Sequence, residues 1–281
     1  MIEADIHTLY QSDFYRILDF KCKCMDCRTS KPEYSESFSI SFVRKGNFLF
    51  NTFRNSHDSY TGCVLVTKPG YERTVTHAHA IPDQCTIFDF TNNFYNEIVA
   101  SYSSLKFLFN NDIHSSLVKT NPEAEVLHKN VLSNIWRKET EKLRMDSIVL
   151  EIIENIFSKV DHYQQDVHLP QNLKKYHLTT IEDAKDYMLK NYQNDISLLQ
   201  LARHCHVSPF HFSRIFKKIT SYSPYQFLTT VRLKNSELLI KETTGSIIDI
   251  ALQSGFNSIE HFTTSFSKKF GTSPAAYRNS Q

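Results

Sequence analysis

The sequence predicts an α+β N-terminal domain, a small β-barrel followed by helices, joined to an all-α C-terminal domain. Three observations predict this fold class. Polar and apolar residues alternate in short runs up to about Phe90, apolar residues recur every three or four positions from Phe94, and the part after Ser197 contains an internal repeat. A period of two indicates strands, whereas spacings of three and four indicate amphipathic helices. The length of 281 residues also fits two domains.

The barrel is predicted from short strands separated by turns. Residues 37–43 alternate polar and apolar side chains, residues 45–47 form a turn, and residues 48–53 continue with β-forming side chains. Residues 62–67, ended by Lys68-Pro69-Gly70, and residues 85–90 are further strands. Such a pattern is typical of a small antiparallel barrel or a jelly roll, which we place at about residues 1–91.

Helices follow the barrel at about residues 92–163. Val126, Leu127, Val131, Leu132, Ile135 and Trp136 form one periodic apolar series, and Ile148, Val149, Ile152, Ile153, Ile156 and Phe157 form another. These helices either pack on their own barrel or form the seam of a homodimer. Residues 1–163 are therefore predicted to be one domain. The polar residues 164–178, which contain Pro170, are predicted to be a linker before a second domain at 179–281.

The composition and the distribution of charge narrow the classes of function that we expect. The chain has only six glycines and no Walker or Rossmann glycine pattern, so nucleotide chemistry is not expected. Its net charge of +2 is unevenly distributed, because 12 Lys and Arg stand against 8 Asp and Glu from Thr179 onward. A basic C-terminal part on an acidic body fits a nucleic-acid-binding module.

Neither a signal peptide nor a membrane span is predicted. The N-terminus, Met1 to Asp5, is acidic, and the apolar stretch at 148–157 is interrupted by Glu151 and Glu154. We therefore expect a cytoplasmic protein that does not bind membranes. The six cysteines are expected to be reduced thiols or metal ligands, not disulfides.

The C-terminal repeat has an offset of 49–51 residues. Residues 197–202 correspond to 246–251, residues 205–208 to 254–257, Phe212 and Phe216 to Phe262 and Phe266, Lys217-Lys218 to Lys268-Lys269, and Ser223-Pro224 to Ser273-Pro274. Each copy predicts a short helix, a tight turn and a second helix. Ser208 and Asn257 are the expected N-caps of the second helices, and Gly255 fits a left-handed turn position.

A long helix is predicted between the copies, from Pro224 to Thr243. Two helix-turn-helix motifs that read one face of DNA should lie about 34 Å apart, which is one turn of the duplex. A rigid helical connector suits that requirement.

The C-terminal part of the sequence resembles the AraC/XylS family of transcription regulators. The resemblance covers about Thr179 to Arg278. It rests on Ser197, Leu201-Ala202, Val207-Ser208-Pro209, Phe212-Ser213-Arg214, Phe216-Lys217-Lys218, Arg232-Leu233, Ile250-Ala251, Gly255-Phe256, Phe262, Phe266, the run from Lys268 to Pro274, and Tyr277-Arg278. It implies a regulator that binds double-stranded promoter DNA and RNA polymerase, senses a small molecule and is able to form a homodimer.

The resemblance also implies the DNA-binding residues. They are Ser208, Pro209, Phe210, His211, Arg214, Lys217 and Lys218 in the first copy, and Asn257, Ser258, Glu260, His261, Thr264 and Lys268 in the second. We expect His211 and Arg214 to reach bases, because Arg is suited to guanine O6 and N7. Lys217, Lys218, Lys268 and Lys269 are expected to contact phosphates, or otherwise to be solvated helix ends.

Two positions depart from the family pattern. His206 stands where the family commonly has glycine, so the first turn is expected to be strained or differently shaped. Thr264 stands where arginine is common, and Glu260 lies nearby. The second motif is therefore expected to contribute less affinity for DNA than the first.

The N-terminal part resembles the cupin-type barrels of such regulators, on the Pro69-Gly70 turn followed by His77. It also contains Cys22, Cys24 and Cys27, and a C-x-x-C spacing lets two thiolates hold one zinc ion. Our preferred zinc ligands are Cys24, Cys27, His77 and Cys85, with Cys63 and His79 as further candidates. The alternatives are a thiol sensor of oxidants or electrophiles, and ordinary reduced cysteines.

Two other functions are also compatible with the sequence. His77 and His79 share one face of a strand, so both imidazoles could bind a catalytic metal, as in a metallo-cupin enzyme fused to a DNA-binding domain. Asp83 is the only acidic residue shortly after them, which weakens that alternative. The helices between Pro122 and Tyr163 could instead bind a protein partner that controls the regulator.

Overall fold

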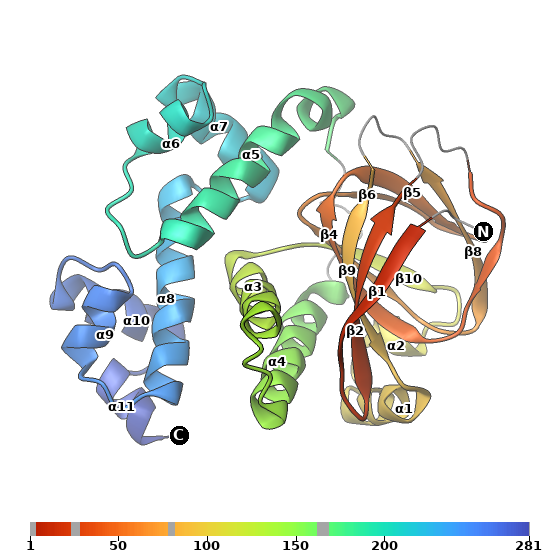
Figure 1. Ribbon diagram of the computed structural model, residues 1–281, viewed down its shortest axis with the longest axis horizontal. Helices are drawn as coiled ribbons and strands as arrows, with labels where there is room; N and C mark the ends of the chain where they lie inside the picture. The colour runs from red at the N-terminus through yellow and green to blue at the C-terminus, as the bar shows by residue number, and fades with distance from the viewer. Residues whose placement is uncertain (1–3, 24–28, 78–81, 162–168, 281) are drawn as a thin grey trace. The chain divides into compact units, whose positions relative to one another are not determined.

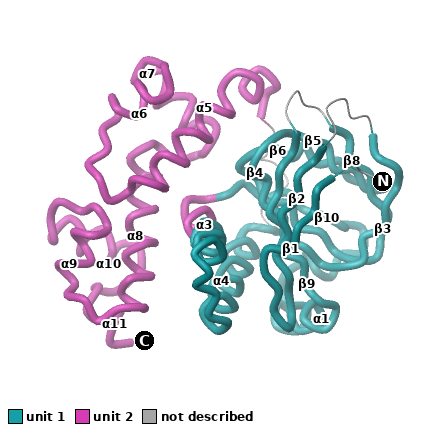
Figure 2. Tube along the Cα trace, in the orientation of Figure 1, with its two compact units in different colours: residues 1–120, 127–168 teal, residues 121–126, 169–281 magenta. Residues whose placement is uncertain are grey.

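The computed structural model describes residues 4–23, 29–77, 82–161 and 169–280. The chain divides into two compact units, which are coloured separately in Figure 2. Unit 1 contains residues 1–120 and 127–168, and unit 2 contains residues 121–126 and 169–281. The predicted order of a β-rich N-terminal part and a helical C-terminal part is confirmed (Figure 1).

Unit 1 contains two antiparallel sheets. The six-stranded sheet has the order β1-β2-β9-β4-β7-β10, and the four-stranded sheet has the order β3-β8-β5-β6. The strands are β1 (Ala4–Gln11), β2 (Tyr15–Cys22), β3 (Glu33–Ser35), β4 (Phe38–Lys45), β5 (Asn47–Thr52), β6 (Ser56–Tyr60), β7 (Cys63–Thr67), β8 (Tyr71–His77), β9 (Gln84–Phe90) and β10 (Ser115–Lys119). Strands β4, β5, β7 and β9 lie where the alternation predicts them.

Strand β10 was not predicted, because its five residues lie between helices in a segment that we interpreted as helical. It pairs antiparallel with β7, where Leu117 lies opposite Leu65. The pairing joins residues about fifty positions apart, and a local periodicity carries no information about such a partner.

The helices of unit 1 cover the outer face of the larger sheet. They are α1 (Asn92–Ser101), α2 (Lys106–Phe109), α3 (Pro122–Arg137), whose residues up to Val126 belong to unit 2, and α4 (Lys142–Val160). The ring of Phe38 on β4 lies 5.1 Å from Tyr95 of α1 and 6.0 Å from Phe157 of α4. The periodic series of α4 is buried, so packing on the chain's own sheet explains it.

Part of the helical surface is nevertheless exposed and apolar. Trp136 at the end of α3 is 70% exposed, and Leu143 near the start of α4 is 75% exposed. A homodimer seam on these helices therefore stays a prediction.

Unit 2 contains helices only, among the residues described. They are α5 (Gln171–Asn191), α6 (Leu198–His204), α7 (Pro209–Thr220), α8 (Pro224–Glu242), α9 (Ile247–Gln253), α10 (Ile259–Phe270) and α11 (Pro274–Asn279). The predicted linker at 164–178 extends too far, because α5 begins at Gln171 and Leu173 and Leu178 are buried. Pro170 is the N-cap of α5, and proline is well tolerated at the start of a helix. The polar residues around it obscure the apolar spacing of the first turns in the sequence.

A buried charged cluster joins α8 to α11. A carboxylate oxygen of Glu237 lies 2.7 Å from the Lys234 ammonium, and the other accepts a 2.7 Å hydrogen bond from the Tyr277 hydroxyl. Lys241 contacts the same carboxylate at 2.7 Å. Burial alone would raise the pKa of Glu237, but these partners outweigh it and lower that pKa.

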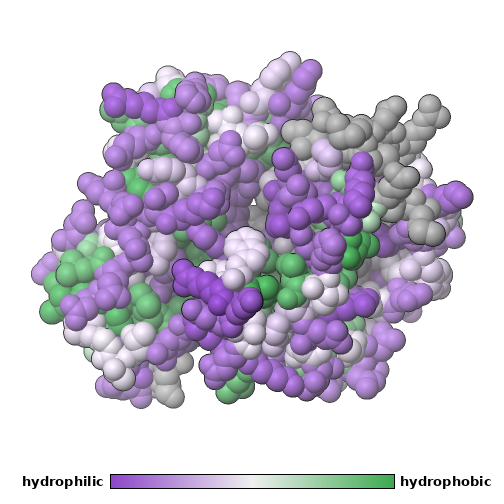
Figure 3. Space-filling view, viewed as in Figure 1, coloured by the Kyte–Doolittle hydropathy of each residue, from purple (hydrophilic) through white to green (hydrophobic). Residues whose placement is uncertain are grey.

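The molecular surface is mostly hydrophilic on the face drawn in Figure 3. One apolar patch on this face lies over α9, where Ile248 and Leu252 are each 58% exposed. Within the described ranges, no helix combines the length and the apolar character that crossing a membrane requires.

Candidate nucleic-acid interface

The two copies of the C-terminal repeat fold as two helix pairs, α6 with α7 and α9 with α10. Their first helices begin alike. The Ser197 hydroxyl accepts a hydrogen bond from the backbone N–H of Gln200, and the Ser246 hydroxyl accepts one from Asp249. In each helix a branched residue and an alanine are buried at the centre, as Leu201-Ala202 and as Ile250-Ala251. Serine N-caps and small buried alanines thus give both copies the same start.

The turns of the two pairs share one hydrogen-bond pattern at an offset of 49 residues. The N–H of Val207 donates to the Ala202 carbonyl at 3.0 Å, and the N–H of Phe256 donates to the Ala251 carbonyl at 3.0 Å. Gly255 has φ +85°, the left-handed conformation that the sequence indicates. His206 occupies the equivalent position with φ +54°, so the first turn keeps the same shape and carries strain.

The second helix of each pair begins at a serine. The Ser208 hydroxyl accepts from the N–H of His211 at 3.3 Å, and the Ser258 hydroxyl accepts from the N–H of His261 at 3.1 Å. Our assignment of Asn257 as an N-cap is therefore wrong. The second turn contains one additional residue, which leaves Asn257 exposed before the cap.

This additional residue also changes the pairing of the lysines. From the N-caps onward the offset is 50, so that the left-handed C-caps Ser221 and Gly271 correspond. Lys218 is then equivalent to Lys268, and Lys217 is equivalent to Ser267. The predicted match of Lys217-Lys218 with Lys268-Lys269 is wrong by one residue.

Both second helices are amphipathic. The buried faces carry Phe212, Ile215, Phe216 and Ile219 on α7, and Phe262 and Phe266 on α10. The exposed residues are Phe210, His211, Arg214, Lys217 and Lys218 on α7, and Glu260, His261, Thr264, Lys268 and Lys269 on α10. Most of the predicted DNA-binding side chains therefore reach solvent, while Ser208 and Ser258 serve as caps and Pro209 is half-buried.

The charge on the two exposed faces is unequal. Arg214, Lys217 and Lys218 form no ion pair with any residue that the structure describes, and the same is true of Lys268. Phe210 adds an aromatic ring that is 76% exposed at the start of α7. On α10, Glu260 lies in the first turn, where its carboxylate accepts a hydrogen bond from the Ser258 hydroxyl. The cationic surface thus concentrates on α7.

Two histidines on these faces have neighbours that the sequence does not reveal. The His261 imidazole Nε2 lies 3.0 Å from the hydroxyl of Tyr225 on α8, and its ring lies 5.5 Å from Phe256. The His211 ring lies 5.2 Å from the His177 ring on α5. Repeat matching aligns each copy with the other, and it carries no signal for contacts with α5 or α8.

The predicted zinc ligands are only partly within the described chain. Cys24, Cys27 and His79 lie outside it, so the zinc site stays a prediction. His77 Nδ1 lies 2.5 Å from a carboxylate oxygen of Asp83, and both side chains are buried. Burial raises the pKa of the Cys85 thiol to about 12, with a further contribution from Asp83. Among the described residues, no group of three or more His, Cys, Asp or Glu is placed to hold a metal ion.

Comparison with known proteins supports the interpretation of unit 2. A family model described as a helix-turn-helix domain matches residues 201–280, which include both turns and both second helices. The bifunctional transcriptional activator and DNA repair enzyme AdaA of Bacillus subtilis is 33% identical over 109 residues, or 39% of this chain and 52% of AdaA. This chain therefore spans about half the length of that relative.

Two further matches have different extents. An uncharacterized HTH-type transcriptional regulator of Bacillus subtilis, YfiF, is 24% identical over 260 residues, covering 82% of this chain and 80% of YfiF. Among solved structures, the DNA-binding domain of AdpA in complex with a target DNA is 27% identical with a TM-score of 0.35, and the match covers 36% of this chain and 91% of that one.

The matched region defines a helix-turn-helix domain built from α6 to α11. The C-terminal part of the chain is similar to the helix-turn-helix regions of AraC/XylS-type transcription regulators.

Proposed function

We propose that the protein is a sequence-specific DNA-binding transcription regulator in which α7 and α10 enter two adjacent major grooves. The observation that carries this proposal is the pair of matched helix-turn-helix units, each with one buried aromatic face and one exposed polar face. A second helix of this kind is the element that enters the major groove in helix-turn-helix proteins. The helix α8 connects the helix pair α6–α7 to the helix pair α9–α10 and sets the distance between them.

The two recognition helices have different roles in this proposal. Arg214 has the fork of donors that matches guanine O6 and N7, and Phe210 presents an apolar ring of the kind that contacts a thymine methyl group. Lys217, Lys218 and Lys268 position the helices on phosphates, which carry no sequence information. Since α10 carries Glu260 and Thr264 where α7 carries Phe210 and Arg214, it contributes less affinity.

A footprint on a selected binding site tests the two-groove arrangement. Binding sites are selected from random duplexes with the full-length protein, and the complex is then cleaved with hydroxyl radicals. We expect two protected segments about 10 base pairs apart on one face of the duplex. A single protected segment that is unaffected by Thr264→Ala or Lys268→Ala would contradict a reading role for α10.

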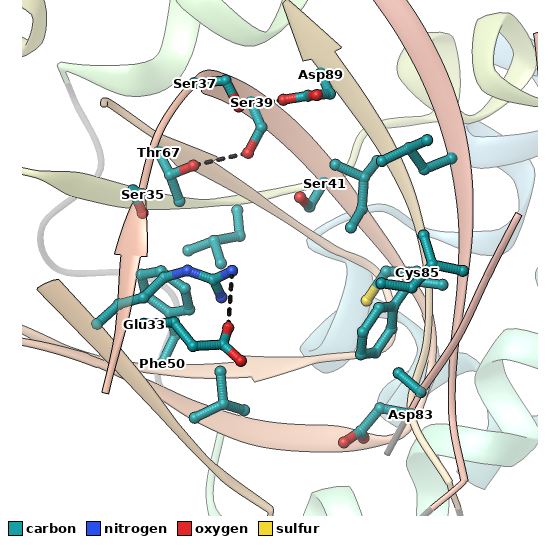
Figure 4. A pocket seen from close by; sticks show the side chains of 18 of the residues that line it. Glu33, Ser35, Ser37, Ser39, Ser41, Phe50, Thr67, Asp83, Cys85 and Asp89 are labelled. Carbon is teal, nitrogen blue, oxygen red and sulfur yellow. Dashed lines mark hydrogen bonds and ion pairs between the residues drawn. The ribbon is translucent and has the colours of Figure 1, made fainter. Parts of the chain in front are cut away.

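Unit 1 is the effector-binding domain in this proposal, with a cupin-type barrel as the sensor. Its two sheets enclose a cavity of 420 Å³ (Figure 4). Following the family resemblance, we also propose that the protein contacts RNA polymerase and forms a homodimer. Both are tested with the full chain, by sedimentation across a concentration series and by transcription from the selected site with purified polymerase. A monomer at every concentration, or no effect on transcription, would remove the corresponding partner. The chemistry we assign to the protein is binding and regulation, not catalysis.

We also propose the zinc site of Cys24, Cys27, His77 and Cys85, and two contacts support it. Thr29 bridges to Thr76 on one side, and the N–H of Cys22 donates to the Asp83 carbonyl at 2.9 Å on the other. The described chain on both sides of the two cysteines therefore lies beside His77 and Asp83. A histidine ligand of zinc usually has a carboxylate partner on its second ring nitrogen, as His77 has in Asp83.

Metal content tests this site. Protein expressed without chelator is expected to contain one zinc ion per chain, and Cys24→Ser is expected to lose it, whereas Cys205→Ser in unit 2 retains it. Absence of zinc from the unaltered protein would rule the site out, and the thiol-sensor alternative would then be tested by oxidation of the same cysteines.

A further inference from the structure

His211 and His261 occupy equivalent places on the second helices of the two pairs. Each is the third residue of its helix, and each donates its backbone N–H to the serine that caps the helix. Both side chains are exposed to solvent. In helix-turn-helix proteins the N-terminal residues of the recognition helix contact base edges. The neighbours of the two imidazoles therefore decide how each one meets a base.

A tyrosine of the connecting helix contacts the imidazole of His261. The Tyr225 hydroxyl lies 3.0 Å from Nε2, which is a hydrogen-bond distance. The imidazole ring also lies 5.5 Å from the ring of Phe256, a buried residue in the turn before α10. Contacts on two sides fix the orientation of the His261 side chain.

The start of α8 holds Tyr225 in place. Tyr225 is the second residue of this helix, and a capping box encloses it. The Ser223 hydroxyl accepts from the N–H of Gln226 at 3.2 Å, and the Gln226 side-chain oxygen accepts from the N–H of Ser223 at 2.9 Å. These reciprocal bonds order the first turn of the helix. Tyr225 is 63% exposed, so the ordered backbone, and not burial, keeps its hydroxyl beside His261.

The hydrogen bond to Tyr225 decides which nitrogen of His261 carries the proton. A neutral imidazole has one N–H donor and one bare nitrogen that accepts, whereas a phenol hydroxyl can do either. The phenol is the better donor of the two groups and the bare nitrogen is the better acceptor, so the favoured bond runs from the Tyr225 hydroxyl to Nε2. The proton of the ring then lies on Nδ1, because the bond at one ring nitrogen sets the state of the other. Nδ1 forms no hydrogen bond with any residue that the structure describes.

His211 lacks a partner of this kind. Its ring lies 5.2 Å from the His177 ring of α5 at an interplanar angle of 68°. Among the described residues, its imidazole forms no hydrogen bond. Both tautomers of His211 are then accessible, so this residue can offer a base either a donor or an acceptor. The same position on α10 offers a donor only.

We propose that Tyr225 is a positioning residue that makes His261 a hydrogen-bond donor to a base edge. The Tyr225 hydroxyl donates to Nε2, and Nδ1–H of His261 donates to the base. The inference rests on the proposed function, in which α10 enters a major groove. The base atoms that can accept are guanine O6 and N7, adenine N7 and thymine O4, whereas the amino groups of adenine and cytosine cannot. Base recognition by α10 thus depends on a residue of α8.

Nuclear magnetic resonance of the free full-length protein measures the tautomer. With nitrogen-15 in the histidine rings, correlations from the ring C–H protons distinguish the protonated nitrogen from the bare one. The His261 signals are those that disappear in His261→Gln. Spectra are recorded at about pH 8, where model histidines are neutral. We expect the proton of His261 on Nδ1.

Tyr225→Phe keeps the ring and removes the hydroxyl, so we expect the proton of His261 to move largely to Nε2, the nitrogen that carries it in a free imidazole. Tyr176→Phe is the matched control, because it removes another exposed hydroxyl, on α5. It should leave the His261 signals unchanged. Melting curves show that both variants remain folded.

Duplexes with altered bases test the donor role of His261. In the part of the selected site that α10 covers, 7-deazapurines remove N7, 2-aminopurine removes guanine O6, and a pyrimidinone analogue of thymine removes O4. We expect one of these changes to weaken binding of the unaltered protein by about 3- to 10-fold, the effect of one hydrogen bond. The same change should have almost no effect on His261→Ala and a smaller effect on Tyr225→Phe. Methylphosphonates at the same positions test the backbone instead.

Four results would overturn the inference. They are a proton on Nε2 of His261 in the unaltered protein, equal effects of Tyr225→Phe and Tyr176→Phe on the His261 signals, a loss that depends on His261 only with methylphosphonates, and no loss that depends on His261. Failure of the proposed function is distinguishable from these results, because the full-length protein would then select no binding site while the free protein kept the tautomer that Tyr225 sets.

Discussion

The side chain of Arg232 on α8 donates a hydrogen bond of 2.8 Å from Nε to the backbone carbonyl of Tyr192, the C-cap of α5. A second guanidinium nitrogen donates to the Asn194 carbonyl, also at 2.8 Å. The turn of the second helix pair packs against this contact, since a Cβ atom added to Gly255 would lie 2.4 Å from the Tyr192 oxygen. The arginine thus joins the end of α5, the connecting helix and the second turn, which fixes the position of the second helix pair within unit 2.

The crowding at Gly255 predicts a large effect of Gly255→Ala. The added methyl group would clash with a backbone oxygen and with Arg232 Nε, and the backbone has φ +85°. Gly271→Ala is the matched control, because Gly271 has φ +75° with nothing within 4 Å of its added Cβ. Left-handed strain alone costs about 1–2 kcal/mol, which we expect for Gly271→Ala. Urea unfolding should show a distinctly greater loss of unfolding free energy for Gly255→Ala, and equal losses would contradict the packing described.

At the equivalent position in the first turn, we expect a substitution to change the unfolding free energy in the opposite direction. His206 adopts φ +54°, which a residue with a Cβ adopts only with strain. His206→Gly relieves that strain and loses some of the gain through the greater entropy of the unfolded chain. We expect a net stabilisation of about 0.5–1 kcal/mol in urea unfolding. A clear destabilisation would show that the imidazole makes a stabilising contact that outweighs its backbone strain.

His128 of α3 is half-buried with its Nε2 atom buried, and we expect it to make unit 1 sensitive to acid. Its ring stacks on Phe42 with centroids 4.3 Å apart, and Nε2 has no hydrogen-bond partner in the described structure. Burial, together with the charge of Arg44, lowers the pKa of His128 to about 3. In the unfolded chain that pKa returns to about 6.5, so unfolding takes up a proton between these values. The stability that neutral His128 provides is complete above pH 6.5 and is lost as the pH falls toward 3.

His128→Phe keeps a ring against Phe42 and removes this proton uptake. As the pH falls from 6 to 4, we expect the free energy of unfolding to decrease by up to about 1.4 kcal/mol more per pH unit in the unaltered protein than in the variant. Urea unfolding across that range measures the difference. His7→Gln is the control, since its side chain is 63% exposed, and it should follow the unaltered protein. Parallel pH profiles for His128→Phe and the unaltered protein would contradict the assignment of the acid sensitivity to His128.

The helix pairs were predictable from sequence because their signals are local. Leu201-Ala202 and Ile250-Ala251 mark the first helices, Ser208 marks an N-cap, and Gly255 marks a left-handed turn. The exposure of Arg214 follows from the burial of Phe212 and Phe216 on a helix of regular period. Repeat matching was off by one residue at Asn257 because several polar residues in succession are all acceptable N-caps.

The missing parts of the prediction depend on residues far apart in the chain. No local pattern encodes the proximity of these segments. Examples are the pairing of β10 with β7, the contact between Tyr225 and His261, and the ion pair between Arg16 and Asp89. The helical start of α5 was obscured because only Leu173 and Leu178 supply its apolar spacing there.

Base reading by α7 is tested by the affinity of Arg214→Ala for a set of base-substituted binding sites. Lys217→Ala, on the same helix, serves as the comparison. We predict that Arg214→Ala loses about 1–3 kcal/mol of binding free energy on the selected site and no longer discriminates between bases at one base pair. Lys217→Ala should weaken binding equally on all sequences and lower the salt dependence of the affinity. An equal loss for Arg214→Ala on every sequence would contradict base reading by α7.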